Sequence, residues 1–155
     1  MKRWCIALVM AVLAVSSAQA KRQAPLIDPP RVAVKNGSGQ PLSADQIKTA
    51  IISGAKSLGW QVNSDTPGAL LLSYNKQNKH YVIVRADYDA EGYQVRYVSS
   101  TNLNYETPAE GGRLIHPGYN IWVDNLIKHV KVVTDVIPAL DAAQPAPTVS
   151  TAASR

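Results

Sequence analysis

The three histidines are the first residues to consider for chemistry, because imidazole serves both as a metal ligand and as a general base. His116 and His129 fall in one predicted helix and are 13 positions apart, which separates them by ~20 Å along the helix axis. Zinc ligands lie only ~2 Å from the ion, so these two cannot share a metal. His80 has no acidic residue at a spacing that would complete a site. We therefore expect three unrelated histidines, no bound metal and no cofactor.

The acidic segment Asp87–Gly92 is similar to the start of a calcium-binding loop, with acids at the first, third and fifth positions and glycine at the sixth. An EF-hand also needs a bidentate glutamate at the twelfth position, which here is Val98. The residues that follow alternate like a strand, whereas an EF-hand loop leads into a helix. The pattern predicts a β-hairpin turn and no calcium site.

Motifs for nucleophilic or phosphate chemistry do not stand out. The sequence has no G-x-S-x-G nucleophile elbow, and Gly111-Gly112 is an isolated pair, not a phosphate-binding loop. The one cysteine, Cys5, lies in an N-terminal segment that we expect to be removed. The sequence therefore favours a non-catalytic protein over an enzyme.

Alternation along two predicted strands gives a candidate binding face. In residues 80–88 one parity is apolar and suits a core, while the other carries Tyr81 and Arg85 with an isoleucine and an aspartate. Arg96 lies on the matching parity of the next strand, residues 93–98. Surfaces that mix arginine, tyrosine and apolar groups are typical of partner sites. The alternative is an ordinary solvated face with scattered apolar residues. We take Tyr81, Arg85 and Arg96 as the candidate site.

A second candidate lies in the long irregular connection Ser99–Gly112, because loops of this length are often functional. Leu103 and Tyr105 have the apolar surface to hold it against the body of the domain. His116 precedes a proline that suits the first position of a helix, and Asn120 follows one turn later. The alternative hypothesis is therefore a small-ligand-binding protein or a hydrolase-type enzyme that uses His116, Tyr105 and Asn120 with the 99–116 loop.

Two predicted helices position these residues. A capping box begins at Ser43, and Gly54 lies on the apolar stripe of the helix that follows, where it favours a close approach to a sheet. The second helix covers residues 117–137, with apolar residues at three- and four-residue steps. Tyr119 and Trp122 belong to that stripe, so we expect them to pack in the interior and not to act as reactive groups.

The predicted strands are short and follow one another closely. Tight polar turns between them favour antiparallel neighbours. These features predict an α+β fold, with an antiparallel meander of about four to five strands and two helices packed on one face. The strands are expected at residues 31–35, 60–62, 69–75, 80–88 and 93–98.

The chain begins with the pattern of a secretory signal peptide: Lys2 and Arg3, an apolar stretch, then small residues up to Ala20. We expect cleavage after Ala20, with twelve apolar residues too few to span a bilayer that needs ~20. Removing Lys2 and Arg3 lowers the net charge from +5 to +3. A net charge of this size does not indicate a nucleic-acid-binding protein. The mature chain is expected to be periplasmic, with extracellular release as the alternative, and without a transmembrane segment.

Several short motifs follow one another in the second half of the chain and near the end of the first helix. They are Gly59-Trp60, Tyr97, Ser100, Asn102-Leu103, Tyr105, Ile115-His116, Tyr119-Asn120, Trp122 and Asn125-Leu126. Their order resembles a family of small, uncharacterised proteobacterial envelope proteins, many described as lipoproteins. The likeness covers about residues 43–135, and this chain departs from it by lacking a cysteine for lipid attachment. The resemblance implies an α+β fold and an envelope location, and it supplies no activity.

Together these patterns predict a single domain over residues 31–140, preceded by a Pro-rich lead-in at 21–30 and followed by a flexible tail at 141–155. The expected function is that of a soluble periplasmic module, without catalysis, which binds an envelope protein or another envelope component through surface contacts.

Overall fold

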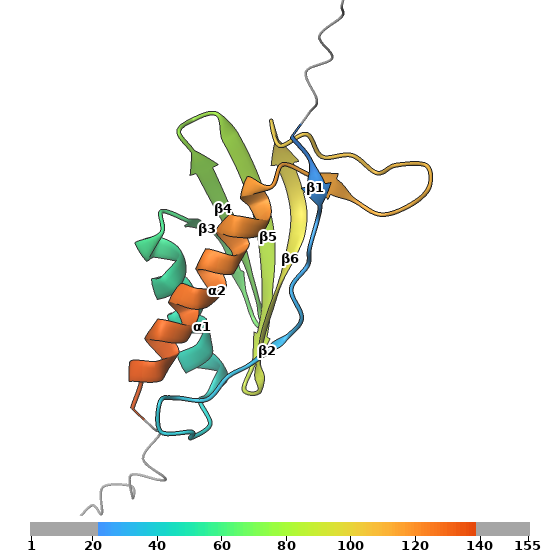
Figure 1. The fold of residues 1–155 in the computed structure, drawn as a ribbon. Helices are drawn as coiled ribbons and strands as arrows, with labels where there is room; N and C mark the ends of the chain where they lie inside the picture. The colour runs from blue at the N-terminus through green and yellow to red at the C-terminus, as the bar shows by residue number, and fades with distance from the viewer. Residues whose placement is uncertain (1–21, 139–155) are drawn as a thin grey trace, which may run out of the picture.

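The computed structural model describes residues 22–138 of the 155-residue chain. The predicted signal peptide of residues 1–20 and the predicted tail of residues 141–155 lie outside the described residues. Within residues 22–138, two helices pack on one side of a five-stranded antiparallel sheet, and a two-stranded sheet lies beside it (Figure 1). The α+β fold with both helices on one face is confirmed.

The large sheet has the strand order β2-β6-β5-β4-β3. The strands from β3 to β6 are consecutive antiparallel neighbours, so they form the predicted meander. The first strand is shorter than expected, whereas β6 continues into the segment that we had assigned to an irregular connection. The strands are Val32–Ala33 (β2), Gln61–Thr66 (β3), Ala69–Lys76 (β4), His80–Asp89 (β5) and Gly92–Thr101 (β6).

Helix α1 spans Ala44–Ser57 and helix α2 spans Gly118–Val136. The predicted capping box at Ser43 is present, with its hydroxyl and backbone both bonded to Gln46. Gly54 does allow a close approach, but to α2 and not to the sheet. A Cβ at Gly54 would lie 2.9 Å from the backbone nitrogen of Val130. The two helices touch because they lie side by side on the same sheet face (Figure 1).

Residues 22–31, which we call the strap, run along the outer edge of β6 (Figure 1). Within the strap, β1 (Ala24–Pro25) pairs with β7 (Leu114–Ile115), and Leu26 is buried in the core. The packed domain therefore begins before residue 31, the boundary predicted from the sequence. The physical reason is that β2 pairs with only the start of β6, and the remaining edge must be covered.

The core lies between the helices and the inner face of the sheet. Apolar side chains of one parity on β4, β5 and β6 meet the buried stripes of α1 and α2. Its largest fully buried members are Tyr93, Tyr119, Ile47, Ile51, Leu70, Leu72, Leu103, Ile115 and Leu126.

Candidate functional site

The side of the large sheet that faces away from both helices is not covered by any element of residues 22–138 (Figure 1), and we call it the open face. Alternation along each strand places every second side chain there. Its centre holds Leu71 of β4, Arg85 and Asp87 of β5, and Arg96 of β6. The side chains of Arg85 and Arg96 are 53% and 51% exposed, so a partner molecule can reach both.

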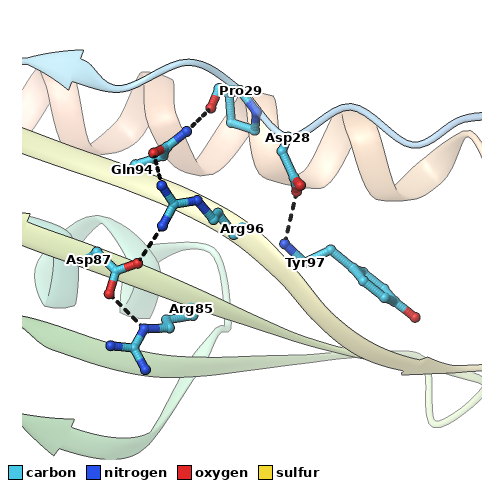
Figure 2. A network of polar contacts seen from close by, with 7 residues as sticks. All are labelled: Asp28, Pro29, Arg85, Asp87, Gln94, Arg96 and Tyr97. Atoms are coloured by element: carbon cyan, nitrogen blue, oxygen red, sulfur yellow. Dashed lines mark hydrogen bonds and ion pairs between the residues drawn. The ribbon is translucent and has the colours of Figure 1, made fainter. Parts of the chain in front are cut away.

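One carboxylate holds the two arginines of the open face (Figure 2). Arg85 Nε donates to Asp87 Oδ1 at 2.6 Å, and Arg96 Nη1 donates to Asp87 Oδ2 at 2.9 Å. Arg85 and Arg96 are also direct register partners across β5 and β6. Like charges directly opposite each other repel, and Asp87 offsets this repulsion. Two guanidinium groups and one carboxylate leave this cluster with one net positive charge.

The network continues over the edge of β6 to the strap (Figure 2). Arg96 Nη2 donates to the side-chain oxygen of Gln94, and Gln94 Nε2 donates to the carbonyl of Pro29 at 3.1 Å. Asp28 accepts the backbone N–H of Tyr97 at 3.0 Å and pairs with Arg113 at 2.5 Å. Side chains of the strap and of β6 therefore supply hydrogen bonds at the edge of β6. The prolines of the strap prevent a continuous ladder of backbone hydrogen bonds there.

Arg85 keeps part of its hydrogen-bonding capacity free. Its Nε is used by Asp87, whereas its two terminal nitrogens have no acceptor among residues 22–138 and point away from Asp87 in Figure 2. Leu71 is the register partner of Arg85 on β4, and Ile83 lies two positions away on the same face of β5. A guanidinium group beside apolar side chains can bind a carboxylate through a bidentate pair of hydrogen bonds.

The structure brings together two of the three residues predicted for this face. Tyr81 shares the face but is four positions from Arg85 along β5, which is ~13 Å, and it pairs with Thr101. The role of Asp87 was missed, because it was interpreted as a solvated turn residue. Counting the register back from the Asp89–Gly92 turn would have found it. No sequence signal placed the strap beside these residues.

The prediction of three unrelated histidines was wrong. His80 and His116 stack with ring centroids 5.6 Å apart. The Nδ1 atom of His80 lies 2.7 Å from the carbonyl oxygen of Asn102 and must donate to it, whereas the Nδ1 atom of His116 accepts the N–H of Gly118. Nδ1 therefore carries a proton in His80 but not in His116, and His116 cannot present a bare Nε2 to a metal without losing the Gly118 bond.

The residues of the alternative site have separate partners. Tyr105 stacks on Tyr97 with centroids 4.8 Å apart, and Leu103 is buried, so both hold the loop as expected. Asn120 donates to the carbonyl of Pro25 and accepts the N–H of Ile27. The imidazole of His116 caps the first amide of α2. These three side chains fasten the strap, the loop and the helix start rather than converging on one point.

The two aromatic side chains of α2, Tyr119 and Trp122, pack against the core but differ in how deeply they are buried. Tyr119 is fully buried, and burial raises the pKa of its hydroxyl above the ordinary value. Its hydroxyl oxygen has no hydrogen-bond partner within the described residues. Trp122 is half-buried at the rim of the core, where it meets Tyr74 edge-on at 5.3 Å and His80 at 6.4 Å. The docking role expected for both residues is confirmed, but that of Trp122 is partial.

Two hollows lie away from the open face. The larger, of about 860 Å³, is bounded by residues 32–37 and the C-terminal end of α2. The smaller, of about 360 Å³, lies between the strap and α2, where Ile27 and Ile121 are exposed. His116 and Tyr105 line neither hollow, so these hollows give no support to an enzyme built on His116.

No protein-family model, curated protein or solved structure matches the chain. Residues 22–138 contain no group of three or more histidine, cysteine, aspartate or glutamate side chains arranged to hold a metal ion. Neither helix in this part of the chain has the length and apolar character needed to span a bilayer.

Proposed function

We propose that the chain is an exported, non-catalytic binding module of the cell envelope, which docks an acidic site of a partner protein on its open face. The observation that carries the proposal is the outward-pointing guanidinium of Arg85, held at its Nε by Asp87 and bordered by Leu71. A guanidinium group whose direction is already fixed beside an apolar surface loses little side-chain conformational entropy when it binds a carboxylate.

Charge and shape both support a protein partner. The open face has a net positive charge at its centre, and Leu71 and Ile83 supply apolar surface around it. Arginine with aliphatic neighbours is common at the centre of protein interfaces, where a few residues dominate the affinity. The face is formed by strands that are already paired in the sheet, so we expect it to bind without rearrangement of the backbone.

Export and envelope location remain part of the proposal. They are supported by the N-terminal pattern of Lys2, Arg3, an apolar stretch and the small residues before Ala20. N-terminal sequencing of the protein purified from a periplasmic fraction tests this part directly. An intact residue 1 on protein that remains inside the cell would contradict it.

The partner can be found by site-specific photo-crosslinking in living cells. A photo-reactive amino acid at Ile83 on the open face is expected to give a discrete protein adduct, while the same amino acid at Val132 on the exposed side of α2 is not. Mass spectrometry then identifies the partner. Adducts that form only from Val132 would contradict docking on the open face.

Affinity measurements on the purified pair test the role of the arginine. We expect Arg85→Glu to weaken binding at least tenfold, equivalent to ~1.4 kcal/mol. The control Lys128→Glu makes the same charge change on α2 and should leave the affinity unchanged. A partner variant with its contacting carboxylate changed to lysine should restore binding to Arg85→Glu. Equal affinities of wild type and Arg85→Glu would refute the proposal.

A further inference from the structure

The end of the domain where β4 turns into β5, which we call the hairpin end, carries a second surface made of the lysines of the turn and of half-buried aromatic rings. We propose that the hairpin end binds the surface of an anionic lipid bilayer. This goes beyond docking of a partner protein, because it uses different residues on a different side of the molecule. The residues of the hairpin end are Arg22, Tyr74, Lys76, Lys79, His80, His116 and Trp122.

The lysines of the hairpin end are not neutralised by any residue that the structure describes. Lys76 and Lys79 flank a tight turn in which Gln77 and Asn78 both adopt left-handed backbone angles, with φ of 56° and 54°. This turn projects from the sheet (Figure 1), and both lysines are exposed. Neither lysine forms an ion pair with a described residue, in contrast to Lys48, Lys128 and Lys131. Unpaired, projecting lysines are suited to an anionic surface.

Aromatic rings lie directly behind these lysines. Tyr74 meets Trp122 edge-on at 5.3 Å, and His80 lies 6.4 Å from Trp122 and 5.6 Å from His116, centroid to centroid. All four rings are half-buried, so each has one edge in the protein and one toward solvent. Rings with an apolar body and a polar edge are enriched at the interface between membrane and water.

The N-terminal end of the strap lies at the same end of the domain. Gln23 Nε2 donates to the carbonyl of Asn104 at 2.8 Å, and Asn102 Nδ2 donates to the carbonyl of Lys79 at 3.0 Å. The strap begins at this end of the domain (Figure 1), and its first described residue, Arg22, is exposed. The predicted cleavage site after Ala20 is separated from Arg22 by Lys21 alone, so this end would be nearest the membrane during export.

These features favour a lipid surface over a soluble anionic ligand. Neither of the two hollows described above is lined by residues of the hairpin end, and its two lysines flank an exposed, projecting turn. A bilayer offers many phosphates at once and an interfacial layer for the rings. Because the contact rests on a few exposed charges, we expect it to be reversible and to weaken as salt screens them.

Vesicle sedimentation tests the proposal. The protein, purified from the periplasm, is mixed at low salt with vesicles of equal parts phosphatidylglycerol and phosphatidylcholine, or of phosphatidylcholine alone. We expect binding to the anionic vesicles alone, and a loss of about tenfold or more in the partition coefficient for Lys76→Glu/Lys79→Glu. The control Lys35→Glu/Lys128→Glu has the same net charge, changed at other sites, and should bind like wild type. Circular dichroism verifies that both variants are folded.

Three outcomes would overturn the proposal. One is equal sedimentation with both kinds of vesicle, which would indicate a contact independent of charge. Another is an equal loss in both double variants, which would indicate an effect of net charge without a defined surface. The third is binding to a soluble polyanion such as heparin without binding to vesicles. Arg85→Glu should retain vesicle binding, so failure of the protein-docking proposal can be told apart from failure of this one.

Discussion

Arg85 and Arg96 are register partners on adjacent strands, and the carboxylate of Asp87 bonds to both guanidinium groups. This arrangement keeps two like charges together at the centre of the open face. It also fixes the direction of Arg85, whose terminal nitrogens remain available.

Replacing Asp87 by asparagine should destabilise the domain by about 1 kcal/mol, because it leaves two arginines opposite each other without a neutralising charge. Urea unfolding measures the loss. The side chains are only partly buried, so the loss should shrink when the salt concentration is raised. A loss that does not change with salt would show that the carboxylate acts as a hydrogen-bond acceptor for the two arginines and not through its net charge.

Gly54→Ala should lower the free energy of unfolding by about 1 to 2 kcal/mol. The new Cβ would lie 2.9 Å from the nitrogen of Val130, and the strain of separating α1 from α2 exceeds the gain in helix propensity. Ser53→Ala is the matched control, since Ser53 is the exposed neighbour of Gly54 on α1, and it should be neutral or slightly stabilising. Equal stabilisation by both changes would contradict the close contact of the helices.

Trp122→Ala should cost about 2 to 3 kcal/mol, less than the ~3 to 4 kcal/mol expected for Leu126→Ala. Both residues face the core from α2, but Leu126 is fully buried and Trp122 is half-buried at its rim. Thermal and urea unfolding of the two variants gives the comparison. If Trp122→Ala were as stable as wild type but failed to bind vesicles, Trp122 would be a binding residue and not a packing residue.

Asp28→Ala should loosen the strap from the edge of β6. The backbone N–H of Tyr97 would lose its acceptor and Arg113 its ion-pair partner, at a cost of about 1 to 3 kcal/mol. Hydrogen exchange is the direct measurement, and the Tyr97 amide should exchange faster in the variant. Asp45→Ala, which removes an exposed carboxylate from α1, should leave that amide unchanged. Unaltered protection of Tyr97 in Asp28→Ala would disprove the bond.

The carboxylate of Asp89 should give stability that depends on pH. Backbone N–H bonds from Glu91 and Gly92, with the charge of Arg31, lower the pKa of Asp89 below its ordinary value of 3.8. A lowered folded-state pKa contributes stability above the unfolded-state pKa, and this contribution is lost as the pH falls through the folded-state value. The stability difference between wild type and Asp89→Asn should be constant above ~pH 5 and should shrink below it. A difference that persists at the lowest pH would contradict the lowered pKa.

Local patterns in the sequence predicted much of this fold. The capping box at Ser43, the apolar stripe that contains Tyr119, and the alternation along β4 to β6 depend on neighbours a few residues apart. They therefore predicted the helices, the meander and the face on which Arg85 and Arg96 lie. Even the bridging position of Asp87 follows from register counted from the Asp89–Gly92 turn.

Only the tertiary structure decided which distant segments meet. It placed the strap on the edge of β6, stacked His80 on His116, and set Gly54 against Val130 in α2 rather than against the sheet. These contacts join residues far apart in the chain, and such pairs leave no periodic trace in the sequence. They form because unpaired strand edges and apolar helix faces must be covered, and the packing of the whole chain selects which segment covers each.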